Sequence, residues 1–227
     1  MPEENEFLKS VPIFSGLDDK ILNQISRLGS RKVYKKDSTI LNENETGSMF
    51  FVIISGKVKV SRSSEDGREI ILSILNPSDF FGEMAILDGL NRSANVIALE
   101  TVELFLIQRL DFLNLLNENS EIAISLLQEL TRRLRASDMK IKSLSLRDAE
   151  GKVASVILQL AEDIVKIKNG KVEIERLPVQ HDLANMAGTS RETISRTINS
   201  FAKRGLIELE ANRLRIVDFE KFKELFR

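Results

Sequence analysis

A repeat of apolar residues in the middle of the chain constrains the fold most strongly. Between residues 127 and 144 these residues recur at alternating steps of three and four, which places them along one narrow edge of a helix. Such a seam needs a second helix against it, so we expect a long helix that packs in a coiled coil. Packing of this helix on a barrel of its own chain is the alternative. The seam positions are Leu127, Leu130, Leu134, Ser137, Ile141 and Leu144, of which only Ser137 is polar.

The part of the chain before this helix is typical of an antiparallel β domain. From about residue 29 to residue 107, short runs of β-branched and aromatic residues are separated by Gly, Asn, Asp and Pro. The Ser-Glu-Asp-Gly segment at residues 64–67 predicts a hairpin turn. Many short strands at this spacing indicate a barrel or sandwich. The expected strands are 50–54, 57–61, 70–75, 96–99 and 102–107, with flanking helices at 18–28 and 110–116.

After the long helix the chain changes pattern again. A helix is expected at residues 152–165, followed by a polar turn at 168–170 and by two helices at 180–186 and 190–203. Ser190 is a natural N-cap for the second of these helices, and Glu192 in its first turn suits the helix dipole. Gly188 falls in the tight turn between the two helices. Strands at 206–210 and 213–217 complete a winged helix-turn-helix, whose second helix enters the major groove.

The second helix of this pair has an apolar stripe and a separate polar sector. At about 100° per residue, the stripe contains Ile194, Ile198, Phe201 and Gly205. The polar residues are types that hydrogen-bond to the edges of DNA bases. The alternative is a solvated face with surface pairs between residues 191 and 195 and between 192 and 196. The polar sector consists of Arg191, Glu192, Ser195, Arg196 and Asn199.

Composition excludes several other classes of protein. The 227 residues include one histidine, His181, and no cysteine. The lack of cysteine excludes disulfides and cysteine-ligated iron–sulfur clusters. The longest apolar runs fall far short of the roughly 20 residues that a membrane span needs, and the acidic N-terminus is unlike a secretory signal. We therefore expect a cytoplasmic protein without membrane contact. The net charge is −1, yet from Ala149 onward 14 basic residues outnumber 12 acidic ones.

The most specific motif lies inside the β-rich region. It consists of Phe-Gly-Glu-Met-Ala-Ile-Leu at residues 81–87 and Asn-Arg-Ser-Ala-Asn-Val at residues 91–96. A carboxylate can accept a hydrogen bond from a sugar hydroxyl, and a guanidinium can bind a phosphate. A serine hydroxyl and nearby backbone N–H groups can hold the same anion. The alternative is a Glu–Arg surface pair on a loop.

Together with Thr-Ser-Arg-Glu-Thr-Ile-Ser-Arg at residues 189–196, this motif resembles the cyclic-AMP receptor (Crp/Fnr) family of transcription regulators. The resemblance covers nearly the whole chain in the right order. It implies an α+β fold with an N-terminal cyclic-nucleotide-binding β-roll (a jelly-roll-like barrel) over residues 1–115. A dimerisation helix would occupy residues 116–148, and a C-terminal winged helix-turn-helix residues 149–227.

The resemblance also implies roles for the motif residues. Glu83 would bind the ribose 2′-hydroxyl, and Arg92 and Ser93 would bind the cyclic phosphate. Gly82 and Met84 would contribute backbone groups.

On the long helix, Arg133 lies where the family has an arginine near the nucleotide. Ser137 and Asp138 occupy the positions of a Thr-Ser pair that grips the adenine amino group from the two subunits. Asp138 departs from that pattern. A carboxylate there can accept from the amino group of adenine and would repel the carbonyl oxygen of guanine, so cyclic AMP is the expected effector.

For the DNA-binding part, the resemblance implies a homodimer that reads double-stranded DNA and contacts RNA polymerase. The receptor branch of the family uses an Arg-Glu-x-x-x-Arg face to read a GTGA core, whereas the oxygen-sensing branch uses Glu-x-x-Ser-Arg to read TTGAT. Only the receptor branch has an arginine at the position of Arg191, which predicts a TGTGA-type palindrome. The expected DNA-binding residues are Ser190, Arg191, Glu192, Thr193, Ser195, Arg196 and Lys203.

Several alternatives to this function stay open. The regulator could act without an effector or answer to another nucleotide. A phosphodiesterase would need a metal-ligand cluster or a histidine near the motif, and neither is visible, so an enzyme is not expected. A regulatory subunit for a partner enzyme would not need the helix-turn-helix. Haem sensing would need a histidine in the effector domain, whereas His181 falls in the DNA-binding part, so we expect neither haem nor an iron–sulfur cluster.

Overall fold

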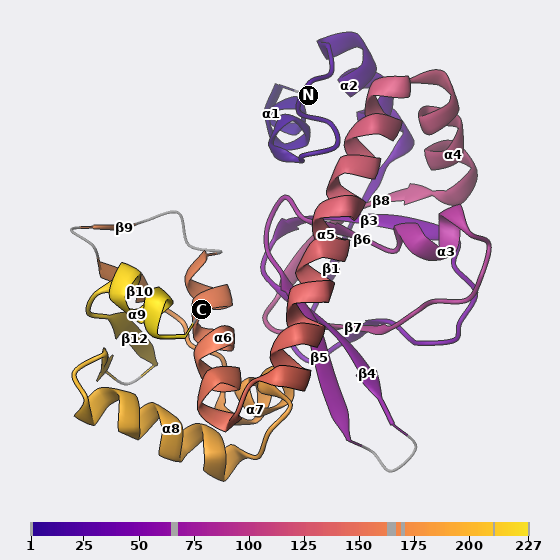
Figure 1. The fold of residues 1–227 in the computed structure, drawn as a ribbon. Coiled ribbons are helices and arrows are strands. Elements are labelled where there is room, and N and C mark those ends of the chain that lie inside the picture. Colours follow the sequence, from indigo (N-terminus) through magenta and orange to yellow (C-terminus); the bar gives the residue numbers. More distant parts are fainter. Residues whose placement is uncertain (1, 65–67, 163–166, 169–170, 211, 227) are drawn as a thin grey trace. The chain divides into compact units, whose positions relative to one another are not determined.

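The computed structural model describes residues 2–64, 68–162, 167–168, 171–210 and 212–226 (Figure 1). The chain forms two compact units, Met1–Arg135 and Ala136–Arg227. The long helix α5 (Ser120–Leu146) contributes its first part to one unit and its last part to the other. None of the described helices is long and apolar enough to cross a membrane.

The first unit contains two four-stranded antiparallel sheets. One has the order β1-β8-β3-β6 and the other the order β2-β7-β4-β5. Their facing side chains form one hydrophobic core, with Phe51, Ile53 and Leu104 from the first sheet packed with Val58 and Val96 from the second. The strands are β1 (Ser30–Tyr34), β2 (Thr39–Leu41), β3 (Met49–Ser55), β4 (Val58–Ser63), β5 (Glu69–Leu75), β6 (Phe80–Phe81), β7 (Asn95–Ala98) and β8 (Val102–Gln108).

The central strands β3 and β8 are covered on both faces, which explains their continuous apolar sequence. Successive side chains of a strand point to opposite faces. In β3, Phe51 and Ile53 face the second sheet, whereas Phe50 and Val52 belong to another core, formed with the helices of this unit. In that core the ring of Phe50 stacks on Phe112, with the ring centroids 4.0 Å apart. Most of its helical residues come from α1 (Pro2–Ser10), α2 (Asp19–Leu28), α4 (Arg109–Glu118) and the first part of α5.

The second unit contains a helix-turn-helix beside a small sheet. Helix α7 (Gln180–Ala187) ends at Gly188, whose φ of 59° lies in the left-handed region that glycine adopts readily. Helix α8 (Arg191–Lys203) follows directly. The sheet has the order β11-β12-β10-β9 and is antiparallel. The other elements are α6 (Ala149–Glu162), β9 (Ile167–Lys168), β10 (Lys171–Ile174), β11 (Ile207–Glu210), β12 (Arg213–Ile216) and α9 (Phe219–Leu225).

The expected β-rich domain, long helix and C-terminal helix-turn-helix are all present, with small shifts in the ends of the elements. Of the eight strands that the structure describes in the first unit, five were expected, and the short strands β1, β2 and β6 were not. Residues 116–118 end α4 instead of beginning the long helix, which starts at Ser120. The wing is not an isolated pair of strands, because β12 pairs with β10 as well as with β11.

Parts of three expected elements lie outside the described residues. They are residues 65–67 of the hairpin turn, residues 169–170 of the polar turn and the last three residues expected of the helix at 152–165. The strands on either side of the hairpin turn, β4 and β5, pair as antiparallel neighbours.

Candidate ligand-binding and DNA-binding sites

The motif at residues 81–87 forms a short helix at the end of a strand. Helix α3 (Glu83–Leu87) follows β6 immediately, and Gly82 joins them with a φ of 85°. A Cβ at this position would lie 2.8 Å from Nη1 of Arg92. Gly82 is therefore required both by its backbone conformation and by the close approach of the arginine.

Glu83 places a carboxylate inside the first unit. Its side chain is 5% exposed, and Arg133 of α5 donates from Nη1 to its Oε1 over 3.4 Å. Burial raises the pKa of Glu83, while the positive charge of Arg133, its own backbone N–H and the charge of Arg92 act in the opposite direction. A buried carboxylate of this kind can serve as an acceptor for a ligand hydroxyl.

Arg92 is equally buried and is held by main-chain groups. Its Nη1 donates to the carbonyl oxygen of Gly82 (2.7 Å) and its Nη2 to that of Met49 (2.8 Å). Burial lowers its pKa, and the charges of Glu83 and Glu45 oppose this. The surface pair considered as an alternative is therefore wrong, because neither Glu83 nor Arg92 lies on the surface. Arg92 thus also has a structural role, because it joins the backbone of Gly82 to that of Met49.

One atom of Arg92 is left without a partner. Nε is buried and makes no hydrogen bond within the described part of the chain. Buried polar atoms are nearly always paired, and an exception calls for an explanation such as a ligand. An oxyanion fits this donor, since a guanidinium offers only N–H donors and a positive charge.

Two of the other residues expected to bind the ligand, Met84 and Ser93, lie at the surface. Ser93 is exposed, and its hydroxyl contacts Sδ of Met84 at 3.5 Å. Met84 is itself 51% exposed. The structure thus brings Gly82, Glu83, Met84, Arg92, Ser93 and Arg133 together in the first unit.

Ser137 and Asp138 are exposed on the part of α5 that belongs to the second unit.

The seam residues of α5 divide into two groups. Leu127, Leu134 and Ile141 are exposed at seven-residue intervals. Leu130 packs against the core of the first unit and Leu144 is half-buried.

Sequence reasoning missed several groups around the motif. The carbonyl oxygen of Met49 accepts a hydrogen bond from Arg92, and that of Phe80 accepts one from Arg133. Glu129 of α5 accepts from both Arg132 and Arg133. Its spacing of three and four residues from the two arginines was a usable signal, because side chains so spaced meet on a helix.

In the second unit, helix α8 presents its first turn to solvent. Ser190 caps the helix by accepting a hydrogen bond from the backbone N–H of Thr193 at 3.1 Å. Ile194, Ile198 and Phe201 are buried as expected, and Thr197 is buried in addition. The structure shows no ion pair between Glu192 and Arg196, both of which it describes. The exposed residues among those expected to bind DNA are Ser190, Arg191, Glu192, Arg196 and Lys203, and the half-buried ones are Thr193 and Ser195.

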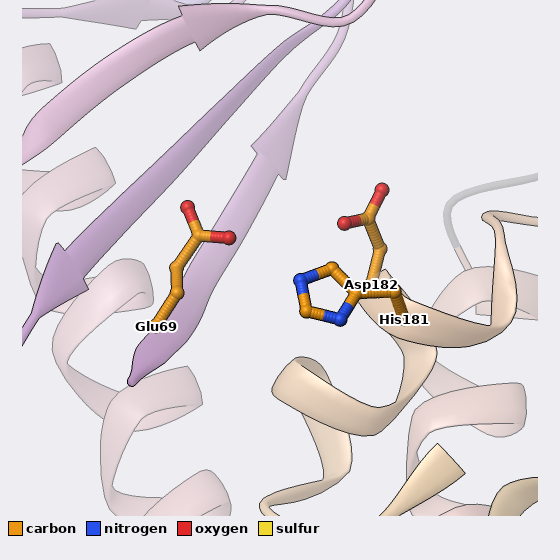
Figure 2. Close-up of side chains that lie close together, drawn as sticks. All are labelled: Glu69, His181 and Asp182. Atoms are coloured by element: carbon orange, nitrogen blue, oxygen red, sulfur yellow. The ribbon is translucent and has the colours of Figure 1, made fainter. Parts of the chain in front are cut away.

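The histidine of the chain lies in the helix-turn-helix. His181 is in the first turn of α7 next to Asp182 (Figure 2), and its Nε2 lies 3.2 Å from Nδ2 of Asn185 one turn later. It therefore belongs to the second unit, in agreement with its expected place outside the effector-binding part.

Comparisons with known proteins match both parts of the chain. A family model described as the cyclic nucleotide-binding domain matches residues 31–119, and one described as the Crp-like helix-turn-helix domain matches residues 151–225. The CRP-like cAMP-activated global transcriptional regulator of Mycobacterium tuberculosis is 32% identical over 217 residues, which cover 96% of this chain and 97% of that protein. The Cyclic AMP receptor protein of Thermus thermophilus is 33% identical over 202 residues, 89% of this chain and 90% of that one.

A solved structure extends the comparison to the fold. The c-di-GMP responsive global regulator CLP of Xanthomonas campestris has a TM-score of 0.75, and the match covers 88% of this chain and 99% of that chain. The sequence identity is 18%, so this likeness concerns the fold alone.

Proposed function

Because the chain belongs to the Crp/Fnr family of DNA-binding transcription regulators, we propose that it is a homodimeric regulator that answers to cyclic AMP and reads a TGTGA-type palindrome. It has a cyclic nucleotide-binding domain and a Crp-like helix-turn-helix. The family regulates transcription and does not consist of enzymes. As a homodimeric regulator it would also contact RNA polymerase.

The buried pair of Glu83 and Arg92 carries the proposal for the ligand. A cyclic nucleotide combines a phosphate anion with a ribose hydroxyl, and the motif offers a cation and an acceptor for these two groups. Nε of Arg92 has no partner among the described residues and is free to donate to a phosphate oxygen. Ser93 is exposed beside α3 and can add a hydroxyl donor, while Glu83 accepts from the 2′-hydroxyl.

The preference for adenine rests on Ser137 and Asp138. Ser137 retains a hydroxyl, and the carboxylate of Asp138 can accept from the amino group of adenine, whereas the carbonyl oxygen of guanine would be repelled. Both side chains are exposed in the single chain. Two relatives that are more than 30% identical are named for cyclic AMP, which supports the same choice.

A second candidate keeps the DNA-binding function and changes the effector. The regulator CLP, with a similar fold, is described as responsive to c-di-GMP. Asp138 supports this candidate, because it stands where the family has a serine that grips the adenine of cyclic AMP. A family member that acts without an effector is the other form of this alternative.

Calorimetric titration of the full-length protein with cyclic AMP, cyclic GMP and cyclic di-GMP tests the proposal. We expect cyclic AMP to bind most tightly. Ser93→Ala should weaken that binding by roughly tenfold, since it removes one hydrogen bond to an anion. Ser30→Ala, which changes an exposed serine of β1, serves as the matched control and should bind as the wild type does. Binding of another nucleotide in place of cyclic AMP, or of none, would overturn the proposed effector.

A gel-shift assay with and without cyclic AMP tests the step from effector to DNA. We expect the nucleotide to increase the affinity for a TGTGA-type palindrome. Equal binding with and without nucleotide would indicate a regulator that needs no effector, and would contradict the proposal.

A further inference from the structure

Glu129 is a buried carboxylate outside the motifs that define the ligand-binding part. It lies on α5 and is 9% exposed. Arg132 donates to it from Nε and Nη2 over 2.8 and 2.7 Å, and Arg133 donates from Nε over 2.9 Å. Two arginines on one carboxylate fix the positions of all three side chains.

Arg133 connects Glu129 to the motif. Besides its bond to Glu129, its Nη2 donates to the carbonyl oxygen of Phe80 over 2.9 Å, and its guanidinium lies 4.2 Å from the centroid of the Phe80 ring. Its Nη1 reaches Glu83 over the longer distance of 3.4 Å. Glu129 and Phe80 thus hold the guanidinium of Arg133 through shorter hydrogen bonds than the one it makes to Glu83.

The position of Arg133 affects the pKa of Glu83. The charged groups that act on Glu83 are Arg133 and Glu129 on α5 and Arg92 before β7. Asp79, before β6, interacts with Arg133, Glu129 and Arg132. Burial raises the pKa of Glu83, and the charge of Arg133 is the largest influence in the opposite direction. Burial alone would raise the pKa of Glu129 too, but the hydrogen bonds and the positive charges of Arg132 and Arg133 together outweigh burial and lower that pKa.

We propose that Glu129 is a positioning residue, which holds the guanidinium of Arg133 beside Glu83 and thereby keeps the Glu83 carboxylate ready to accept from a ribose hydroxyl. The part that concerns the ribose rests on the proposed function. The part that concerns Arg133 and Glu83 does not, and it can be tested without any ligand.

Glu129→Gln distinguishes a positioning role of Glu129 from a direct effect of its charge, because the two predict opposite changes in the pKa of Glu83. Removing a negative charge near Glu83 would by itself lower the pKa of Glu83 and favour an anionic ligand. A released Arg133, in contrast, would no longer stabilise the charged form of Glu83, so the pKa of Glu83 would rise and the ligand would bind more weakly. The proposal predicts the second outcome.

The first measurement is an NMR titration of the Glu83 side-chain carboxyl in the ligand-free protein. We expect a higher pKa in Glu129→Gln than in the wild type. Glu121→Gln removes the same charge from an exposed position of the same helix and should leave the pKa of Glu83 unchanged. An unchanged or lower pKa in Glu129→Gln would show that Glu129 does not position Arg133.

The second measurement is calorimetry with cyclic AMP. Glu129→Gln should bind roughly tenfold more weakly than the wild type, as expected when a charged hydrogen-bonding group loses its alignment, and Glu121→Gln should bind normally. Equal or tighter binding by Glu129→Gln would refute the inference and leave the proposed function intact. If the wild type binds no cyclic nucleotide, the proposed function fails and the NMR titration alone decides the inference.

Arg133→Lys is the second variant, for use if Glu129→Gln does not fold. Lysine keeps the positive charge but lacks the planar fork, so it cannot contact Glu129, Phe80 and Glu83 together. We expect the same upward change in the pKa of Glu83. A pKa equal to that of the wild type would mean that charge alone suffices, and would overturn the proposal.

Discussion

Arg92 is held by two backbone carbonyls, and glycines leave room for its guanidinium. A Cβ at Gly47 would lie 2.5 Å from Cβ of Ala85 and 3.1 Å from Cζ of Arg92. Gly82 approaches the same guanidinium from the other segment of the motif. Arg92 therefore links β3, the start of α3 and the loop before β7, and under the proposed function the same guanidinium binds the phosphate of the ligand.

Arg92→Ala is predicted to destabilise the protein as well as to abolish tight binding of the effector. The substitution leaves the buried carbonyls of Gly82 and Met49 without their donors, which costs on the order of 1–3 kcal/mol for each group that stays unsatisfied. Denaturant unfolding measures the loss. Arg27→Ala, on the exposed face of α2, should stay within about 0.5 kcal/mol of the wild type. Equal stability of Arg92→Ala and wild type would show that the two hydrogen bonds contribute nothing to the fold.

Helix α5 uses its faces for different contacts. Leu126 and Leu130 contribute to the helical core of the first unit, whereas Leu127, Leu134 and Ile141 are each more than 60% exposed. Three exposed apolar side chains at heptad spacing are typical of a helix that packs against a partner. The predicted dimer seam therefore consists of the exposed residues, and Leu130 also serves the core of its own chain.

Leu134→Lys is predicted to convert the dimer to a folded monomer. Leu134 is 63% exposed in the single chain, so the substitution should not disturb the folding of α5 but would place a charge in the seam. Sedimentation analysis gives the molecular mass, and circular dichroism confirms the helix. Leu225→Lys changes a leucine of α9 that is 51% exposed and outside the seam, and it should remain dimeric. A dimeric Leu134→Lys protein would place the interface elsewhere.

At the scale of the whole molecule, the proposed palindrome would be read by two copies of helix α8, one from each subunit of the proposed homodimer. A homodimer with two-fold symmetry reads a palindrome whose half-sites lie about one helical turn apart. The exposed first turn of α8 provides Arg191 and Glu192, and Arg196 follows one turn later. An arginine can bind guanine through both O6 and N7, and a glutamate can accept from the cytosine amino group.

Arg191→Ala is predicted to weaken binding to the TGTGA-type site by about 1–3 kcal/mol and to relax the preference at one guanine. The measurement is selection from random duplexes at fixed salt with cyclic AMP present, followed by affinity measurements on single-base variants of the site. Lys203→Ala is the control, because a phosphate contact should weaken binding to all sequences alike. Selection of TTGAT-type half-sites by the wild type would show that Arg191 does not read a base.

Local sequence patterns were sufficient for the order of the elements and for much of the secondary structure. Uninterrupted apolar residues predicted strands such as β3 because both of their faces are buried, and Ser190 marked the start of α8 because a cap acts within one turn. Glu83 and Arg92 could be predicted as ligand-binding residues because both lie in one short motif, which is visible in the sequence itself.

Only the tertiary structure decided which partners these residues have. Arg92 bonds to Met49, 43 positions away, and Arg133 bonds to Phe80, 53 positions away. Packing also decided that Leu130 faces the core while Leu127 stays exposed, although both fit the same seam. The physical reason is the same in each case. A repeat or a cap depends on neighbours within a few residues, whereas a buried donor must find its acceptor wherever the folded chain places one.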